Sequence, residues 1–201
     1  MRKVIVSMNV TLDGYISGPN CELDWHFNRW APDMGKRLGE ELSKTDTILL
    51  GRITYEAMAR YWPLKEMDMS FPRDDIAFAF MMNKHHKVVY SKTLQKAKWN
   101  NSTLIRGNIK DEINKLKQFR SEQDKNIIIY GSTKLVSALM QLSLVDEYQL
   151  WVHPIILGKG KPLFRKLKNT SELKLLNSKI FKSGVILLHY ATIVTSRKIK
   201  I

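Results

Sequence analysis

The chain has 201 residues, of which 44% are hydrophobic and 26% charged, a balance that supports one packed domain over residues 1–201 and excludes a mainly disordered chain. Its one cysteine, Cys21, cannot form an internal disulfide, which excludes a disulfide-stapled secreted fold and fits a cytoplasmic protein. No apolar run approaches the roughly 20 residues that span a bilayer. We therefore expect neither a membrane partner nor a signal peptide.

Basic residues outnumber acidic residues by 33 to 19, which gives a formal net charge of +14. The excess is uneven, because the chain from Gly158 onwards holds eleven Lys and Arg but one acid, Glu172. This balance suits nucleic acid, a phosphate-bearing small ligand or simple solubility. The basic residues lack the interleaved aromatics of a single-strand platform, and no helix-turn-helix or ribonucleoprotein signature is present. We therefore expect a small-molecule ligand and no nucleic-acid partner.

The first part of the chain is predicted to alternate between strands and helices. Val4–Val10 is rich in β-branched residues and predicts an opening strand, and the turn formers in residues 11–20 predict a long loop. An apolar stripe with a four-residue repeat predicts a helix that begins at Pro32-Asp33. A buried strand at Thr47–Leu50 and a helix at Arg52–Tyr61 follow.

The later elements continue this alternation and then change character. We predict strands at residues 87–90, 102–106, 126–130 and 147–153, helices after Asn108 and at Thr133, and a closing hairpin of residues 173–182 and 185–195. The pattern predicts an α/β fold: a three-layer sandwich whose central sheet is mostly parallel, with an antiparallel hairpin at its C-terminal edge. In such sheets, ligands bind at the carboxyl ends of the strands.

Two strand-to-helix junctions at that edge contain glycine. They are Gly51 with Arg52 and Thr54, and Gly131 with Ser132 and Thr133. A strand that turns through glycine into a helix leaves backbone N–H groups at the positive end of the helix dipole, where a phosphate can approach closely. Two such sites on neighbouring strands would suit the two ends of a dinucleotide. Alternatively, the glycines only permit tight turns and the hydroxyls only cap helices.

Other motifs for cofactors and metals are absent from the sequence. Gly158–Leu163 begins as a GxG motif, but Pro162 blocks a helix there, so the usual dinucleotide fingerprint is missing. His85 and His86 are adjacent and point apart in a strand, so we predict no metal site. His153, which precedes a proline, is expected to pack at a strand end.

Several short motifs occur in a familiar order between about residue 2 and residue 165. They are Met8–Ile16, Leu50–Glu56 (GR-x-T-[YFW]-E), Tyr90–Leu94 (S-[RK]-T-L), Gly131-Ser132, and Leu144–Glu147 with Pro154–Phe164 (LVDE…P-x-x-L-G-x-G-x-x-L-F). Together they resemble the dihydrofolate-reductase-like superfamily, which includes dihydrofolate reductase and the reductase domain of the riboflavin-biosynthesis deaminase–reductase.

The resemblance implies a cofactor, NADPH, bound across the carboxyl ends of the sheet. By the same resemblance, the turns at Gly51/Thr54 and at Gly131-Ser132-Thr133 would hold the diphosphate, and the Gly131–Ser132 peptide would be cis. Arg52, Ser91 and Lys92 would bind the adenosine 2′-phosphate, because a dianion requires cationic donors. Backbone groups near Val10 and Ile16 would hold the nicotinamide carboxamide.

The substrate side resembles the superfamily less closely. Leu23-Asp24-Trp25 and Pro32-Asp33-Met34 loosely resemble the segment in which dihydrofolate reductase has an acid that anchors the pterin ring. This implies Asp33 as the catalytic acid and Trp25 as a stacking wall, although Asp33 equally suits a helix cap. Ser7 stands where the riboflavin-pathway reductase usually has a lysine for the substrate phosphate.

We therefore predict an NADPH-dependent reductase that transfers a hydride to a small heterocyclic substrate resembling a pterin or a pyrimidinone. It would be a divergent relative of dihydrofolate reductase and of 5-amino-6-(5-phosphoribosylamino)uracil reductase. The alternative is an NADPH-binding module without competent catalysis, acting as a sensor or accessory protein. Alternating strands near the C-terminus, with Leu150 and Trp151 predicted to be exposed, suggest a homodimer.

Overall fold

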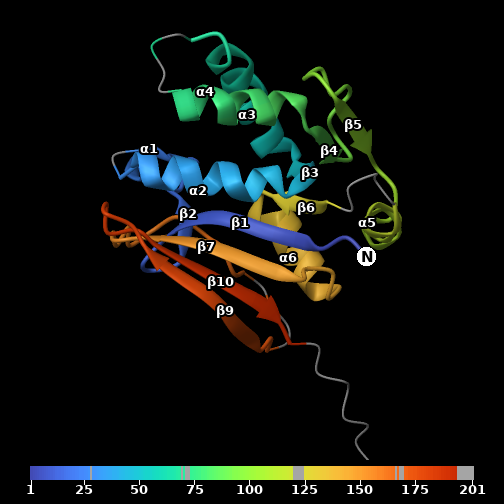
Figure 1. The fold of residues 1–201 in the computed structure, drawn as a ribbon. Coiled ribbons are helices and arrows are strands. Elements are labelled where there is room, and N and C mark those ends of the chain that lie inside the picture. The colour runs from blue at the N-terminus through green and yellow to red at the C-terminus, as the bar shows by residue number, and fades with distance from the viewer. Residues whose placement is uncertain are drawn as a thin grey trace, which may run out of the picture.

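The computed structural model describes residues 1–27, 29–68, 70, 73–119, 125–165, 167 and 170–193 (Figure 1). The strands are β1 (Val4–Thr11), β2 (Tyr15–Ser17), β3 (Thr45–Gly51), β4 (His86–Tyr90), β5 (Ser102–Ile105), β6 (Asn126–Ile129), β7 (Glu147–His153), β8 (Lys161–Pro162), β9 (Leu173–Ile180) and β10 (Ile186–Thr192). The helices are α1 (Asp24–Phe27), α2 (Pro32–Ser43), α3 (Arg52–Lys65), α4 (Arg73–Lys84), α5 (Ile109–Gln118) and α6 (Thr133–Gln141). No helix in these ranges is long and apolar enough to cross a membrane.

Eight strands form one sheet in the order β5-β4-β3-β6-β1-β7-β10-β9, and β2 pairs with β8 in a second, two-stranded sheet. The first six strands in this order are parallel, whereas β10 runs antiparallel to both β7 and β9. Parallel neighbours arise because each crossover passes through a helix or a long loop, whereas the turn at residues 181–185 joins β9 directly to β10. The predicted α/β class, with its mostly parallel sheet and antiparallel edge hairpin, is confirmed.

Helices cover both faces of the sheet and make three layers (Figure 1). On one face, α5 and α6 pack against a core cluster that includes Val4, Val6 and Ile129. On the other face, α2, α3 and α4 enclose a second cluster that includes Ile48, Leu50 and Ile128. The residues of one strand alternate between the two layers because successive strand side chains point to opposite faces.

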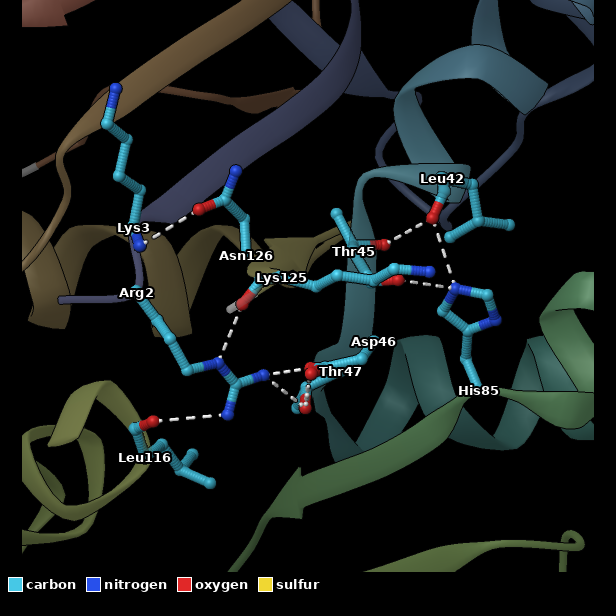
Figure 2. Close-up of polar contacts among 10 residues, drawn as sticks. All are labelled: Arg2, Lys3, Leu42, Thr45, Asp46, Thr47, His85, Leu116, Lys125 and Asn126. Atoms are coloured by element: carbon cyan, nitrogen blue, oxygen red, sulfur yellow. Dashed lines mark hydrogen bonds and ion pairs between the residues drawn. The ribbon is translucent and has the colours of Figure 1, made fainter. Parts of the chain in front are cut away.

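The amino end of the sheet is closed by a buried arginine, Arg2 (Figure 2). Its guanidinium donates to the carbonyl oxygens of Lys125 at 2.8 Å and Leu116 at 3.2 Å, to the Thr47 hydroxyl at 2.8 Å and to the Asp46 carboxylate. These bonds join segments far apart in the sequence at the end opposite the glycine junctions. One basic residue of the net excess is therefore structural.

The prediction that Leu150 and Trp151 are exposed is wrong, because β7 is an interior strand paired on both sides. Their relative exposures are 8% and 3%. Large exposed apolar side chains lie instead on the edge strand β9, at Leu175, Leu176 and Ile180. The homodimer remains a prediction.

Candidate functional site

The two glycine junctions meet at the carboxyl edge of the sheet. β3 and β6 are parallel neighbours, so Gly51 and Gly131 emerge side by side, and the Gly51 N–H donates to the Gly131 carbonyl oxygen at 3.0 Å. The Gly131–Ser132 peptide is cis, as the family resemblance implies. The sequence separates these turns by 80 positions, but the fold joins them in one structure.

At both positions, any residue other than glycine would disturb the opposite turn, because its Cβ would collide with that turn. A Cβ on Gly51 would lie 2.7 Å from the Ser132 Oγ, and a Cβ on Gly131 would lie 2.8 Å from the Thr54 Oγ1. Gly131 also has a φ of +135°, a backbone conformation that residues with side chains rarely adopt. The two turns together present backbone N–H groups and the hydroxyls of Thr54, Ser132 and Thr133, and we call this surface the glycine cradle.

Two helices begin at this cradle, and neither is capped by a side chain. Gly51 is the N-cap of α3, and Ser132 is the N-cap of α6 but makes no capping bond. In contrast, Asn108 caps α5 by accepting a hydrogen bond from the Lys110 N–H, as predicted. The first N–H groups of α3 and α6 are therefore open to an anion, and the helix dipoles favour one. The alternative that the Ser132 hydroxyl only caps a helix is therefore not supported, since this hydroxyl makes no capping bond.

A cleft beside the start of α3 carries positive charge. It is lined by Arg52, Glu56, Thr93, Leu94, Gln95, Lys96 and Lys98, and we call it the basic cleft. Arg52 pairs with Glu56 at 3.0 Å, and Arg106 holds the loop by donating to the Leu94 carbonyl oxygen at 2.7 Å. The cleft thus offers three cationic side chains against one carboxylate.

Two of the residues predicted to bind the 2′-phosphate lie outside the lining of this cleft. The Ser91 side chain is buried, and its Oγ accepts from the N–H groups of Thr93 at 3.2 Å and Leu94 at 3.0 Å, so it shapes the turn after β4. Lys92 is exposed and is not a lining residue. Lys96 and Lys98, which sequence reasoning missed, line the cleft with Arg52.

Val10 and Ile16 lie on the two strands that flank the turn between β1 and β2. Asp13 fixes this turn, because its carboxylate accepts from the N–H groups of Leu157 at 3.1 Å and Gly158 at 2.7 Å. The pKa of Asp13 is lowered, first by the Thr11 hydroxyl and then by these backbone donors. The glycine-rich block after β7 therefore holds the β1–β2 turn in place.

A second hollow, which we call the aromatic cavity, lies between α1–α2 and α3–α4 above β1. Its volume is about 510 Å³. Seven aromatic side chains line it: Phe27, Trp30, Tyr61, Trp62, Phe78, Tyr130 and Trp151. The remaining lining residues are Ser7, Asn9, Leu23, His26, Leu38, Ala57, Met58, Asp75 and Met82.

The polar groups at the base of this cavity are mostly bonded to the protein. The Ser7 Oγ accepts from the Trp151 Nε1 at 3.2 Å, and the Asn9 Oδ1 lies 2.9 Å from the His153 Nε2. The Tyr130 hydroxyl is buried without a hydrogen-bond partner, and its pKa is raised by burial and by Glu41. A buried donor without a partner is costly, so Tyr130 favours a ligand with an acceptor.

The two predicted catalytic residues, Trp25 and Asp33, are not among the residues that line the cavity. Trp25 is buried, and its ring packs edge-on against His153 with centroids 5.1 Å apart. Asp33 is in the first turn of α2, and one of its carboxylate oxygens is buried without a hydrogen-bond partner. Their roles stay predictions.

Sequence reasoning missed the residues that actually line the cavity. His26 comes from α1 and Trp30 from the residues between α1 and α2, whereas Asp75 and Phe78 come from α4, a helix that we did not predict. No spacing in the sequence connects these segments to Ser7 on β1. The one available signal was the density of aromatic residues between positions 25 and 80.

Comparisons with known proteins agree with this geometry. A model of the RibD C-terminal domain family matches residues 2–187. The uncharacterised protein YyaP of Bacillus subtilis (strain 168) is 37% identical over 189 residues, which cover 94% of each chain.

Two solved structures share the fold at low identity. A protein of Shewanella sp. PV-4, whose name places it provisionally in riboflavin biosynthesis, has a TM-score of 0.73 at 21% identity and covers 95% of this chain and 99% of its own. Dihydrofolate reductase from Enterococcus faecalis, complexed with NADP(H), has a TM-score of 0.60 at 14% identity and covers 94% of this chain and 96% of its own. The resemblance to the dihydrofolate-reductase-like superfamily is thereby confirmed, and the chain belongs to the RibD C-terminal domain family.

Proposed function

We propose that this protein is an NADPH-dependent reductase that transfers a hydride to a small, planar heterocycle. The observation that carries the proposal is the meeting of two uncapped, glycine-opened helix starts at neighbouring strand ends. A diphosphate is the group that such a pair of helix starts binds best, because both helix dipoles and several N–H donors converge on it.

The residues around the cradle fit NADPH along its length. Gly51 and Gly131 let the two turns approach each other closely, because a Cβ on either one would collide with the opposite turn. Thr54, Ser132 and Thr133 provide hydroxyls at these turns. Arg52 would bind the 2′-phosphate together with Lys96 and Lys98, since these three cations line the adjoining basic cleft. Backbone groups near Val10 and Ile16 would hold the carboxamide.

When bound, NADPH supplies a hydride; the protein must orient the acceptor and exclude water. The aromatic cavity suits the acceptor, because flat rings stack on Trp and Tyr side chains and its walls are mostly apolar. A proton must also reach the reduced ring. We assign that role to Asp33, whose buried carboxylate oxygen has no hydrogen-bond partner.

Turnover distinguishes a reductase from an NADPH-binding module. We expect the absorbance band of NADPH to decay with a member of a panel of dihydropterins, pyrimidinones and quinones. Tight NADPH binding without any decay across the panel would favour the module. For Asp33→Asn we expect turnover to be abolished while NADPH affinity is unchanged; normal turnover by this variant would remove Asp33 from the mechanism.

A further inference from the structure

A row of four polar side chains crosses the sheet on the face that α2 covers. Gln149 of β7 pairs with Ser7 of β1 on one side and with His189 of β10 on the other. Tyr130 directly follows β6, whose pairing with β1 places it beside Ser7. Residues that pair across neighbouring strands point to the same face of a sheet. We call Tyr130, Ser7, Gln149 and His189 the polar row.

Glu41 of α2 lies close to this row. It is buried, and its charge interacts with His189 at one end of the row and with Tyr130 at the other. Arg37 on the same helix and Lys44 at the C-cap are the other charged groups that act on it. The Arg37 Nε lies 3.1 Å from the Glu41 Oε1, but burial outweighs this pair and raises the pKa of Glu41 to about 7. Glu41 can therefore hold or release a proton near neutral pH.

The two ends of the polar row reach different surroundings. At one end, the His189 Nε2 lies 2.8 Å from the Glu147 carboxylate, to which the exposed Lys3 Nζ donates at 2.6 Å. At the other end, Ser7 and Tyr130 line the aromatic cavity. The row therefore leads from the surface of the protein to the space in which we propose that the substrate binds.

Four oxygen atoms along this route are buried without a hydrogen-bond partner among the residues that the structure describes. They are both carboxylate oxygens of Glu41, the Gln149 Oε1 and the Tyr130 hydroxyl. The Ser7 Oγ accepts from the Trp151 Nε1 and can still donate its own O–H. In folded proteins, internal water bridges such groups, with about three hydrogen bonds to each water. Glu41, the row and internal water can thus form one hydrogen-bonded chain, and such chains carry protons.

The aromatic cavity needs a route of this kind. Its seven aromatic side chains exclude water, and each turnover of the proposed reductase consumes one proton along with the hydride of NADPH. We propose that the polar row is a proton path, in which Glu41 holds a proton and passes it through the Tyr130 hydroxyl and internal water into the cavity. This inference deepens the proposed function, on which it rests for the consumption of a proton.

The protons balance over one turnover. Asp33, to which we assign the protonation of the ring, gives up one proton and regains one from this path. Glu41 loses that proton and is protonated again from solvent through the His189 end of the row. Because Glu41 does not line the cavity, it acts through Tyr130, which does.

The first test follows the pH dependence of the reduction of a dihydropterin by NADPH. The protonated form of Glu41 is the competent one, so kcat of the unmodified protein should fall as the pH rises through about 7. Glu41→Gln keeps the size of the side chain; it should lower kcat roughly tenfold or more and remove this fall, with KM for NADPH unchanged. Glu40→Gln makes the same change on the exposed neighbour and should alter neither quantity. An unchanged kcat and pH profile in Glu41→Gln would overturn the proposal.

The second test is an infrared titration that needs neither NADPH nor a ligand. The band of a protonated carboxyl group should persist where exposed carboxylates are ionised and disappear as the pH rises through about 7. This band should be absent from Glu41→Gln and retained in Glu40→Gln. Tyr130→Phe removes a donor from beside the carboxylate, so the band should persist to higher pH in this variant. A band that never appears, or a titration that ignores Tyr130→Phe, would exclude the path even in an active reductase.

The two proposals fail independently. The expected infrared titration in a protein that turns over no compound of the panel would sustain the pairing of Glu41 with Tyr130 and refute the reductase. Turnover with the same pH profile in Glu41→Gln as in the unmodified protein would sustain the reductase and refute the path. If Glu41→Gln does not fold, the infrared titrations of the unmodified protein and of Tyr130→Phe decide.

Discussion

The basic cleft and the aromatic cavity lie on either side of α3 and differ in almost every chemical property. The cleft is lined by three cationic side chains (Arg52, Lys96 and Lys98), by the carboxylate of Glu56 and by Thr93, Leu94 and Gln95. The cavity is lined by seven aromatic side chains and one carboxylate. Phosphate groups are favoured in the first and disfavoured in the second.

The net charge of +14 therefore does not predict the chemistry of the aromatic cavity. Three cations line the cleft where we propose that a phosphorylated cofactor binds, whereas the described lining of the aromatic cavity is mostly apolar and contains no lysine or arginine. Arg2 shows in addition that part of the basic excess is structural, since it ties three segments together at the opposite end of the sheet (Figure 2).

The largest expected effect is on the cradle. Gly131→Ala places a Cβ 2.8 Å from the Thr54 Oγ1 at a φ of +135°, so both the turn and the phosphate site must distort. We expect NADPH affinity to fall by roughly 100-fold or more, as measured by calorimetry, because several backbone donors lose their alignment together.

Gly39→Ala is the matched control for this change. Gly39 lies in α2, and its Cβ would meet only the Met81 Cε at an ordinary 3.6 Å. This variant should bind NADPH normally and gain about 0.5–1 kcal/mol of stability, because alanine favours a helix. Equal losses of NADPH affinity in the two glycine variants would refute the cradle.

The next largest effect separates the two nicotinamide cofactors. Arg52→Ala should weaken the binding of NADPH by roughly tenfold or more and leave the binding of NADH unchanged, because only NADPH carries the 2′-phosphate. Adding Lys96→Ala should reduce the preference for NADPH over NADH further, whereas adding Lys92→Ala should reduce it less, since Lys92 does not line the cleft. Fluorescence titration with both cofactors measures the ratio, and parallel losses for NADH would contradict the assignment.

A smaller effect is expected in the cavity. Trp30→Ala removes one stacking surface and should weaken the binding of a dihydropterin by roughly three- to tenfold, with NADPH affinity intact. Loss of NADPH affinity in this variant, with the fold preserved, would show that the two regions are not chemically separate.

The smallest effect on either ligand is expected at Glu41. Burial raises its pKa to about 7, although the Arg37 Nε lies 3.1 Å from its Oε1. Because the pKa in the folded state exceeds the ordinary value of 4.5, this group's contribution to stability is complete below pH 4.5 and is lost as the pH rises through 7.

Glu41→Gln should therefore flatten the fall in the free energy of unfolding between pH 5 and pH 8, an effect of up to roughly 3 kcal/mol. Urea unfolding at both pH values tests this expectation, with NADPH affinity as the control. An unchanged pH dependence would mean that the carboxyl group ionises freely in the folded protein.

Most of the fold could be predicted because its signals are local. The strand at residues 147–153, the Asn108 cap and the closing hairpin each depend on a few adjacent residues, and the structure confirms them. The helix that begins at Arg52 continues past Pro63 to Lys65, beyond the predicted end at Tyr61. Helix α4 was missed because its apolar residues are not confined to one face: Phe78 and Met82 are buried, but Phe80 between them is exposed.

The candidate site could likewise be predicted from the sequence only where its signals are local. The glycine turns were found because each lies within a short motif, and their meeting follows from the pairing of β3 with β6. The aromatic cavity was not found, because His26, Tyr61 and Asp75 come from three elements that only the packing of helices brings together. Leu150 and Trp151 were misjudged because alternation alone does not show whether a strand is interior or at an edge.

The most direct test of the NADPH cradle is a calorimetric titration of the purified protein with NADPH and, separately, with NADH. We predict saturable heat with NADPH, measurably weaker binding of NADH, and a smaller difference between the two cofactors in Arg52→Ala. No heat with NADPH at millimolar concentration would contradict the account and would leave the glycine junctions as tight turns without a ligand.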